Sequence, residues 1–174
     1  MTKRISAPFG PETVKSLRAG DRVLLSGKIW TGRDAAHKRL CALLDEGKAL
    51  PVNLENELIY FVGPCPASPG KVIGSAGPTT SGRMDAYSPR LIDACHLAGM
   101  IGKGNRSAAV VEAMKRGPAV YFAATGGAGA LISKCIKKAD VAAFGDLGPE
   151  AIFRLEIEDL PLVVAIDCYG KSLY

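Results

Sequence analysis

The chain has 174 residues and a formal net charge of +5, with 48% hydrophobic and 22% charged residues. This composition is typical of globular proteins and excludes wholesale disorder, and the length suits one domain, residues 1–174. The longest apolar runs, such as 162–166, are far shorter than the ~20 residues of a membrane-spanning helix. No apolar segment follows the basic start of the chain, so we expect no signal peptide and a cytoplasmic protein.

The apolar pattern predicts strands that alternate with helices. In chain order, the expected elements are a strand at 21–30, a helix at 33–47, strands at 58–62 and 71–75, a helix at 89–97, a strand at 100–101, a helix at 106–116, a strand at 119–124, a helix at 129–138, and strands at 141–144, 153–157 and 162–166. Ser88 is placed to cap the helix at 89–97, and Gly99 to end it. Such alternation indicates βαβ units and an α/β fold with a parallel or mixed sheet.

The five cysteines stand far apart, and none belongs to a Cys-x-x-Cys motif. This spacing argues against a zinc ribbon or an iron–sulfur motif held by this chain alone. Their odd number and the lack of an export signal argue against disulfides, so we expect reduced and mostly buried thiols. The two histidines and scattered cysteines form no metal-binding constellation, and we expect His96 to be a packed histidine.

The segment 31–39 lies where the first strand gives way to a helix. Arg33 and His37 are four residues apart, so they share a helix face. A helix N-terminus favours an anion, and an arginine there can grip a carboxylate with two hydrogen bonds. The alternative is an ordinary amphipathic helix with Lys38 and Arg39 in solvent.

The segment 74–85 places three consecutive hydroxyl residues, 79–81, between Gly-Pro and Gly-Arg pairs. Glycines let the backbone approach a ligand, hydroxyls donate or accept hydrogen bonds, and Arg83 adds a fixed charge. The Gly-x-x-x-x-Gly-Lys pattern of a phosphate-binding P-loop is absent. This pattern favours a binding loop over an incidental polar turn.

Glycines also frame Lys103, which follows the expected strand at 100–101. A lysine in that position reaches an anion with little obstruction, although a solvated lysine in a flexible loop fits the spacing equally well. Gly126-Gly127-Ala128-Gly129 follows a strand and opens a helix, but residue 132 is Ile where a dinucleotide-binding fingerprint needs its third glycine. Only 6% of the residues are aromatic and no dense basic stripe occurs, which argues against nucleic-acid binding.

Together these loops resemble the β subunit of class I fumarate hydratase and of L(+)-tartrate dehydratase. The segments that carry the resemblance are 31–37, 63–64, 77–84, 102–104, 126–128, 147–152 and 159–170. They are distributed over most of the chain, and the Thr-Thr-Ser-Gly-Arg sequence at 79–83 is the most specific among them.

The resemblance implies a swivelling β/β/α domain with a mixed sheet, and an enzyme of two parts. An α subunit would carry an oxygen-sensitive [4Fe-4S] cluster, which agrees with the lack of a cysteine motif here. The expected assembly is αβ or α2β2, without membrane or nucleic-acid partners, and the expected substrate is a dicarboxylate whose hydroxyl and carboxylate meet the open iron of the cluster.

The resemblance also implies roles for five residues. Arg33, Arg83 and Lys103 match substrate-binding positions, and fixed cations there would stabilise the charge of an aci-carboxylate. Thr79 and His37 match positions associated with proton transfer; a neutral threonine needs help to act as a base, whereas imidazole has the more suitable pKa.

The segments 126–128 and 147–152 look more like the fumarase branch, so the first expectation is reversible hydration of fumarate to (S)-malate. Conversion of L(+)-tartrate to oxaloacetate and water is the second. A non-catalytic module that binds an anion or supports assembly is a third possibility, since the same loops could serve it.

Overall fold

The computed structural model describes residues 1–65, 67, 69–124 and 129–174. Its elements in chain order are β1 (Thr2–Ala7), α1 (Pro11–Ser16), β2 (Arg22–Thr31), α2 (Asp34–Asp45), β3 (Leu58–Tyr60), the 3₁₀ helix η1 (Ser81–Met84), α3 (Ser88–Cys95), β4 (Gly99–Gly102), α4 (Ala108–Arg116), β5 (Val120–Ala123), α5 (Gly129–Lys134), β6 (Ile136–Ala143), the 3₁₀ helix η2 (Gly145–Glu150) and β7 (Ile152–Ile166).

Five of the strands close into a barrel. The pairs β2–β3, β3–β4 and β4–β5 are parallel, whereas the long strand β7 runs antiparallel to both β5 and β2. Because β7 joins both ends of the β2-to-β5 row, the sheet has no free edge there. β1 extends from β2 and β6 from β7. This mixed α/β barrel confirms the expected swivelling β/β/α fold.

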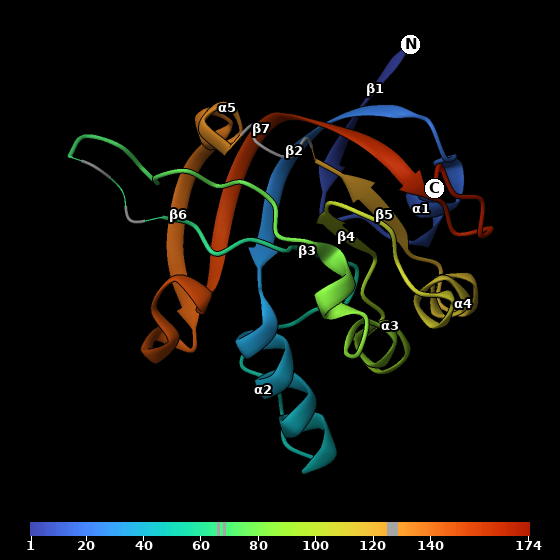
Figure 1. Ribbon diagram of the computed structural model, residues 1–174, viewed down its shortest axis with the longest axis horizontal. Helices are drawn as coiled ribbons and strands as arrows, with labels where there is room; N and C mark the ends of the chain where they lie inside the picture. The colour runs from blue at the N-terminus through green and yellow to red at the C-terminus, as the bar shows by residue number, and fades with distance from the viewer. Residues whose placement is uncertain (66, 68, 125–128) are drawn as a thin grey trace.

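Alternating side chains of the barrel strands supply two hydrophobic cores. Phe122, with Leu25, Leu155 and others, belongs to a cluster formed by one face of the strands. Its neighbour Tyr121 belongs to a second cluster, which includes residues of α2, α3 and α4. The alternation follows from the twofold period of a strand, and the three helices lie on one side of the barrel (Figure 1).

Several expected elements differ in the structure. The segment 71–75 is not a strand: β3 already pairs with β2 and β4, so the barrel has no open position beside it. Instead the Cys65 amide donates to the Ser75 carbonyl and the Gly74 amide donates to the Cys65 carbonyl, so the end of this segment lies beside Cys65. The strands expected at 153–157 and 162–166 form one strand, β7, with Asp159 at a φ of 51° between them.

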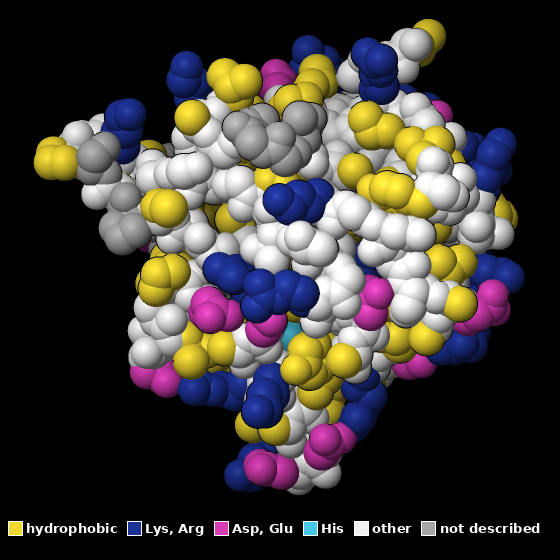
Figure 2. Space-filling view, in the orientation of Figure 1, with side chains coloured by type: hydrophobic (Ala, Val, Ile, Leu, Met, Phe, Trp, Pro, Cys, Tyr) yellow, Lys and Arg dark blue, Asp and Glu magenta, His cyan; other side chains and the backbone are white. Residues whose placement is uncertain are grey.

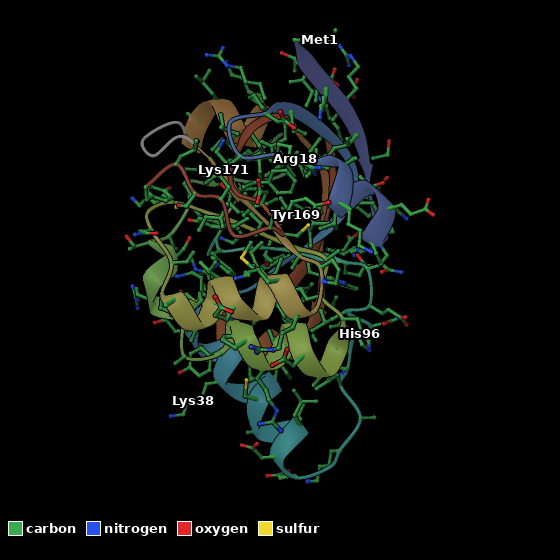
Figure 3. The ribbon with its side chains drawn as sticks, turned by 90° about the vertical axis from the view of Figure 1, so that its right-hand side faces the viewer. Met1, Arg18, Lys38, His96, Tyr169 and Lys171 are labelled. Atoms are coloured by element: carbon green, nitrogen blue, oxygen red, sulfur yellow. The ribbon has the colours of Figure 1, made fainter. Side chains whose placement is uncertain are left out.

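The ends of α3 also differ from expectation. Ser88 is the first residue of the helix and its hydroxyl donates to the Met84 carbonyl (3.1 Å), so it does not cap the helix. The helix ends at Cys95; the next residue, His96, has a left-handed φ of 57°, and Gly99 instead begins β4. His96 is exposed at the end of α3 (Figure 3), so the expectation of a packed histidine is wrong.

All five cysteines are free thiols, but the expectation that most are buried is wrong. Cys168 is buried and Cys65 is exposed, while the other three are half-buried. Within the described residues, no helix combines the length and apolar character that crossing a membrane requires.

Candidate functional site

The loop that carries Thr79 runs between two barrel strands. The Thr79 amide donates to the Phe61 carbonyl just after β3 (2.7 Å), and the Ser81 amide donates to the Lys103 carbonyl just after β4 (2.9 Å). Thr80 forms an isolated parallel bridge with Lys103. The hydroxyl loop is therefore fixed across the carboxyl ends of β3 and β4, and it lies next to the exposed Lys103.

Close packing at Gly102 fixes the same region. A Cβ atom at Gly102 would overlap the Ser81 hydroxyl and would lie 2.9 Å from the Phe61 ring. The buried Ser81 hydroxyl is also hydrogen-bonded to the Tyr121 hydroxyl (2.7 Å). The glycine before Lys103 thus serves the packing of the hydroxyl loop against the barrel.

Arg33 stands at the N-cap of α2, directly after β2. Its side chain lies against Gly63, where a Cβ atom would be 2.9 Å from both Cδ and Nη1 of Arg33. The Arg33 Nε is buried and has no hydrogen-bond partner among the described residues. Arg33 therefore packs against the backbone of Gly63, and its Nε–H can donate to a ligand or a water molecule.

Arg83 on η1 forms an ion pair with the first residue of α2. Its Nε donates to Asp34 Oδ2 (2.9 Å), and its Nη2 lies 2.7 Å from the same oxygen. The other oxygen of Asp34, Oδ1, is buried without a partner among the described residues. This ion pair joins two of the loops that the sequence singled out, and nothing in the local sequence pattern of Asp34 had marked it.

His37 is 1% exposed, one turn into α2. Its Nδ1 lies 2.8 Å from the Arg33 carbonyl oxygen, so Nδ1 carries the proton and donates it. The ring packs edge-on against Phe61 (5.4 Å between centroids), and Nε2 is buried without a partner in the described part of the chain. Burial lowers the pKa of His37 from 6.5 to about 4, because the charged imidazolium loses its water.

The N-terminus of α2 is already occupied by a carboxylate of this chain. The Ala35 amide donates to Glu150 Oε1 (3.3 Å), and Glu150 belongs to η2, far along the sequence. An amide expected to face a bound anion therefore faces Glu150. The positive charge of Arg33, rather than a free helix end, is what this segment offers a ligand.

Comparison with known proteins gives the family. The sequence model described as fumarase C-terminus matches residues 4–174. The chain belongs to the fumarase C-terminus family. It is 38% identical over 166 residues to a chain of Methanocaldococcus jannaschii assigned as L(+)-tartrate dehydratase subunit beta, covering 92% of this chain and 85% of that protein.

Two fumarate hydratases are similar over the same region. The anaerobic class I fumarate hydratase of Escherichia coli is 38% identical over 154 residues, and fumarate hydratase 2 of Leishmania major is 37% identical over 160 residues. These matches cover 88% and 89% of this chain, but it spans only 28% of the length of each of the two relatives. The resemblance inferred from the loops is thus confirmed at the level of the family, while the choice between fumarate and tartrate is not resolved.

Within this fumarase C-terminus domain, contacts link the five sequence-predicted residues. Lys103 bridges to the Thr79 loop, Phe61 joins that loop to His37, and His37 bonds to Arg33. Arg83 connects to the start of α2 through Asp34. Basic side chains gather near the middle of one face, close to the start of α2, with acidic side chains beside them (Figure 2).

A buried ion pair that sequence reasoning missed supports this face of the fumarase C-terminus domain. Arg106 donates from Nε to Asp85 Oδ1 (2.7 Å) and from Nη2 to the Ser88 hydroxyl (2.7 Å), and its side chain is 0% exposed. Its guanidinium lies 5.1 Å from the centroid of the Phe61 ring, directly behind the site. From the sequence, an arginine after a glycine-rich loop would be expected to lie in solvent. Only its contacts with Asp85 and Ser88 show that Arg106 has a structural role.

Of the glycines in the possible dinucleotide-binding motif at 126–129, only Gly129 lies in the described part of the chain, and its surroundings do not support that interpretation. Gly129 begins α5, and a Cβ atom there would lie 2.8 Å from the Gly77 amide nitrogen, so close packing explains this glycine. The rest of that motif, 126–128, lies outside the described residues, as does its contribution to the resemblance.

Arg83 and Lys103 are exposed at the surface, Arg33 and Thr79 are half-buried, and His37 is buried beneath them. A cavity of about 650 Å³ is lined by Cys65 and the segment 71–75 on one side and by α5 and the start of β6 on the other, but none of the five residues lines it. Within the described ranges, no three His, Cys, Asp or Glu side chains are grouped so that they could hold a metal ion. This part of the domain offers cations and hydroxyls, which suit a carboxylate ligand rather than a metal.

Proposed function

We propose that this chain is the β subunit of a two-subunit iron–sulfur hydro-lyase that interconverts fumarate and (S)-malate, and that it acts only together with an α subunit. The observation that carries the proposal is the convergence of Arg33, Arg83 and Lys103 through direct contacts of their loops. Fumarate is preferred because the sequences at 126–128 and 147–152 look more like the fumarase branch, and because several relatives carry the name fumarate hydratase.

The cations of this chain would bind the two carboxylates of the substrate. Removal of a proton from the carbon beside a carboxylate transfers negative charge onto that carboxylate. A cation fixed before the reaction stabilises this added charge more than it stabilises the bound substrate, and the difference lowers the barrier. Arg33 suits this role because its Nε is buried and unpartnered among the described residues, which strengthens its electrostatic effect.

The two proton-transfer candidates differ in their access to a substrate. Thr79 is half-buried in the hydroxyl loop, whereas His37 is 1% exposed and uses its Nδ1 proton on the Arg33 carbonyl. We therefore assign proton transfer to Thr79, with nearby cations favouring its ionised form. His37 would then hold the Arg33 backbone and remain neutral.

The [4Fe-4S] cluster would belong to the α subunit, because the described residues of this chain present no group of cysteines near the site. When bound, the cluster supplies a Lewis-acidic iron for the hydroxyl and one carboxylate of the substrate. We expect an αβ or α2β2 assembly in the cytoplasm, in which the open face of this chain is closed by its partner.

L(+)-tartrate dehydratase is the second candidate, and a specific observation favours it. The match to the Methanocaldococcus jannaschii chain covers 85% of that protein at 38% identity, whereas the matches to the two fumarate hydratases cover 28% of each. Under this alternative the same cations would bind the two carboxylates of tartrate.

The test is reconstitution under anaerobic conditions. This chain would be produced together with an iron–sulfur α subunit, purified as a pair, and assayed for fumarate hydration and tartrate dehydration, with the α subunit alone as the blank. A matched pair of variants reports on the site: Lys103→Ala should lower the activity, whereas Lys38→Ala should not, because Lys38 points away from the domain on α2 (Figure 3). A pair that acts on neither acid would reject the enzymatic assignment and favour an anion-binding or assembly module.

A further inference from the structure

Asp34 holds one edge of the Arg83 guanidinium. Both hydrogen bonds go to one oxygen: Nε donates to Oδ2 at 2.9 Å, and Nη2 lies 2.7 Å from it. The Arg83 side chain is 53% exposed, so without this pairing it would sample many rotamers. The pairing leaves Nη1 and the outer hydrogen of Nη2 free of Asp34, and these can grip a carboxylate end-on.

The second oxygen of Asp34 argues against a purely structural ion pair. Oδ1 is buried and has no hydrogen-bond partner among the described residues. A buried acceptor without a donor lowers stability, and such groups concentrate at functional sites. If the ion pair served only to join η1 to α2, burying Oδ1 without a hydrogen-bond donor would lower stability and bring no benefit.

We propose that Asp34 is the positioning residue for Arg83, aiming the free end of its guanidinium at a carboxylate of the substrate. The inference rests on the proposed function. It predicts an effect of Asp34 on kcat that the negative charge of Asp34 alone would not predict. Asp34 is negative, so it opposes the binding of a dicarboxylate; yet it orients Arg83 for the transition state. Its removal should therefore lower kcat while KM stays the same or falls.

Asp34→Asn and Asp34→Ala test this in the reconstituted pair. We expect kcat to fall by about tenfold or more, since small misplacements of binding groups cost up to about 100-fold in rate. KM should not rise. Asp45→Asn is the matched control, because Asp45 ends the same helix and pairs with Arg90 on α3 (2.6 Å), at the end of α2 opposite to the site.

A readout without catalysis separates positioning from helix stability. Asp34 is also the acidic residue in the first turn of α2, where it favours the helix. In nitrogen-15 NMR spectra of the full chain, the Arg83 Nε–H should be protected from exchange in the wild type and in Asp45→Asn, and unprotected in Asp34→Ala. The melting temperature should be similar in the two asparagine variants.

The outcomes are distinct. Wild-type kcat in both Asp34 variants, a raised KM with unchanged kcat, or a protected Arg83 Nε–H in Asp34→Ala would each overturn the proposal. A wild-type pair that is inactive on fumarate and tartrate would instead reject the proposed function, and the Nε–H signal would then decide by itself whether Asp34 holds Arg83. If Asp34→Ala does not fold, Asp34→Asn carries the same comparison.

Discussion

His37 should contribute a loss of stability as the pH falls from neutral to acidic values. The imidazole is 1% exposed and donates through Nδ1 to the Arg33 carbonyl, while Nε2 has no partner among the described residues. Because burial disfavours the imidazolium, the pKa of His37 falls from 6.5 to about 4 in the folded chain.

The direction of the effect follows from proton binding in the two states. Above pH 6.5 His37 is neutral in both the folded and the unfolded chain and contributes no pH dependence. As the pH falls from 6.5 to about 4, the unfolded chain binds a proton that the folded chain does not, so the free energy of unfolding decreases. One pKa unit corresponds to 1.36 kcal/mol, so the full shift is worth about 3 kcal/mol. Below pH 4 the folded chain is protonated too, and the loss levels off.

Urea titrations of the full chain from pH 8 to pH 4 measure this quantity when wild type is compared with His37→Asn. Asparagine places an N–H near the position of Nδ1 but does not titrate, so its smaller volume shifts the stability by a constant. The difference between the two curves should narrow as the pH falls below 6.5. Parallel curves would refute the reasoning, and His96→Asn at the exposed histidine tests whether any histidine replacement has this effect.

Three further substitutions test other parts of the structure. Arg83→Ala in the assembled enzyme should lower kcat/KM by the equivalent of about 2.7–4 kcal/mol, as for loss of a comparable transition-state donor, and near-wild-type kinetics would remove Arg83 from the site. Asp85→Asn should lower the free energy of unfolding by about 3–5 kcal/mol, because it leaves the buried Arg106 without its carboxylate; a loss in urea titrations well below this range would contradict that account. Gly102→Ala should cost about 1–3 kcal/mol through overpacking, whereas Gly82→Ala, which has open space for its Cβ, should not; equal stabilities would contradict the packing argument.

Much of the fold was predictable because its core elements carry strong apolar patterns. The strand and helix expected at 21–30 and 33–47 correspond to β2 and α2, since both bury one regular face. β1 was missed because its residues are mostly exposed and show little apolar alternation. The strand predicted at 71–75 is wrong for the opposite reason. Its apolar residues suggest a strand, but a strand needs a free sheet edge, and the closed barrel leaves none beside β3.

The cations of the candidate site could be proposed from the sequence, whereas the carboxylates beside them could not. Glycines beside arginine or lysine marked the loops of Arg33, Arg83 and Lys103, because such loops let a charge approach a ligand. Glu150 contacts the α2 N-terminus from 115 residues away in the sequence, and Asp34 meets η1 from 49 residues away. A local pattern contains no information about such partners, so the carboxylates that orient or compete with the cations appear only in the folded chain.

These carboxylates bear on why the site would need a partner. The candidate site has three cations, Arg33, Arg83 and Lys103, and two carboxylates, Asp34 and Glu150, so its net charge is about +1. A dicarboxylate brings two negative charges, and proton removal would add more negative charge to one of its carboxylates. The cations of this chain therefore do not balance the charge of the reacting substrate by themselves, and fixed cations stabilise such charge most strongly where water is excluded. The missing positive charge and the exclusion of water would have to come from the surface that closes over this open face, which is the role that the proposed α subunit would fill.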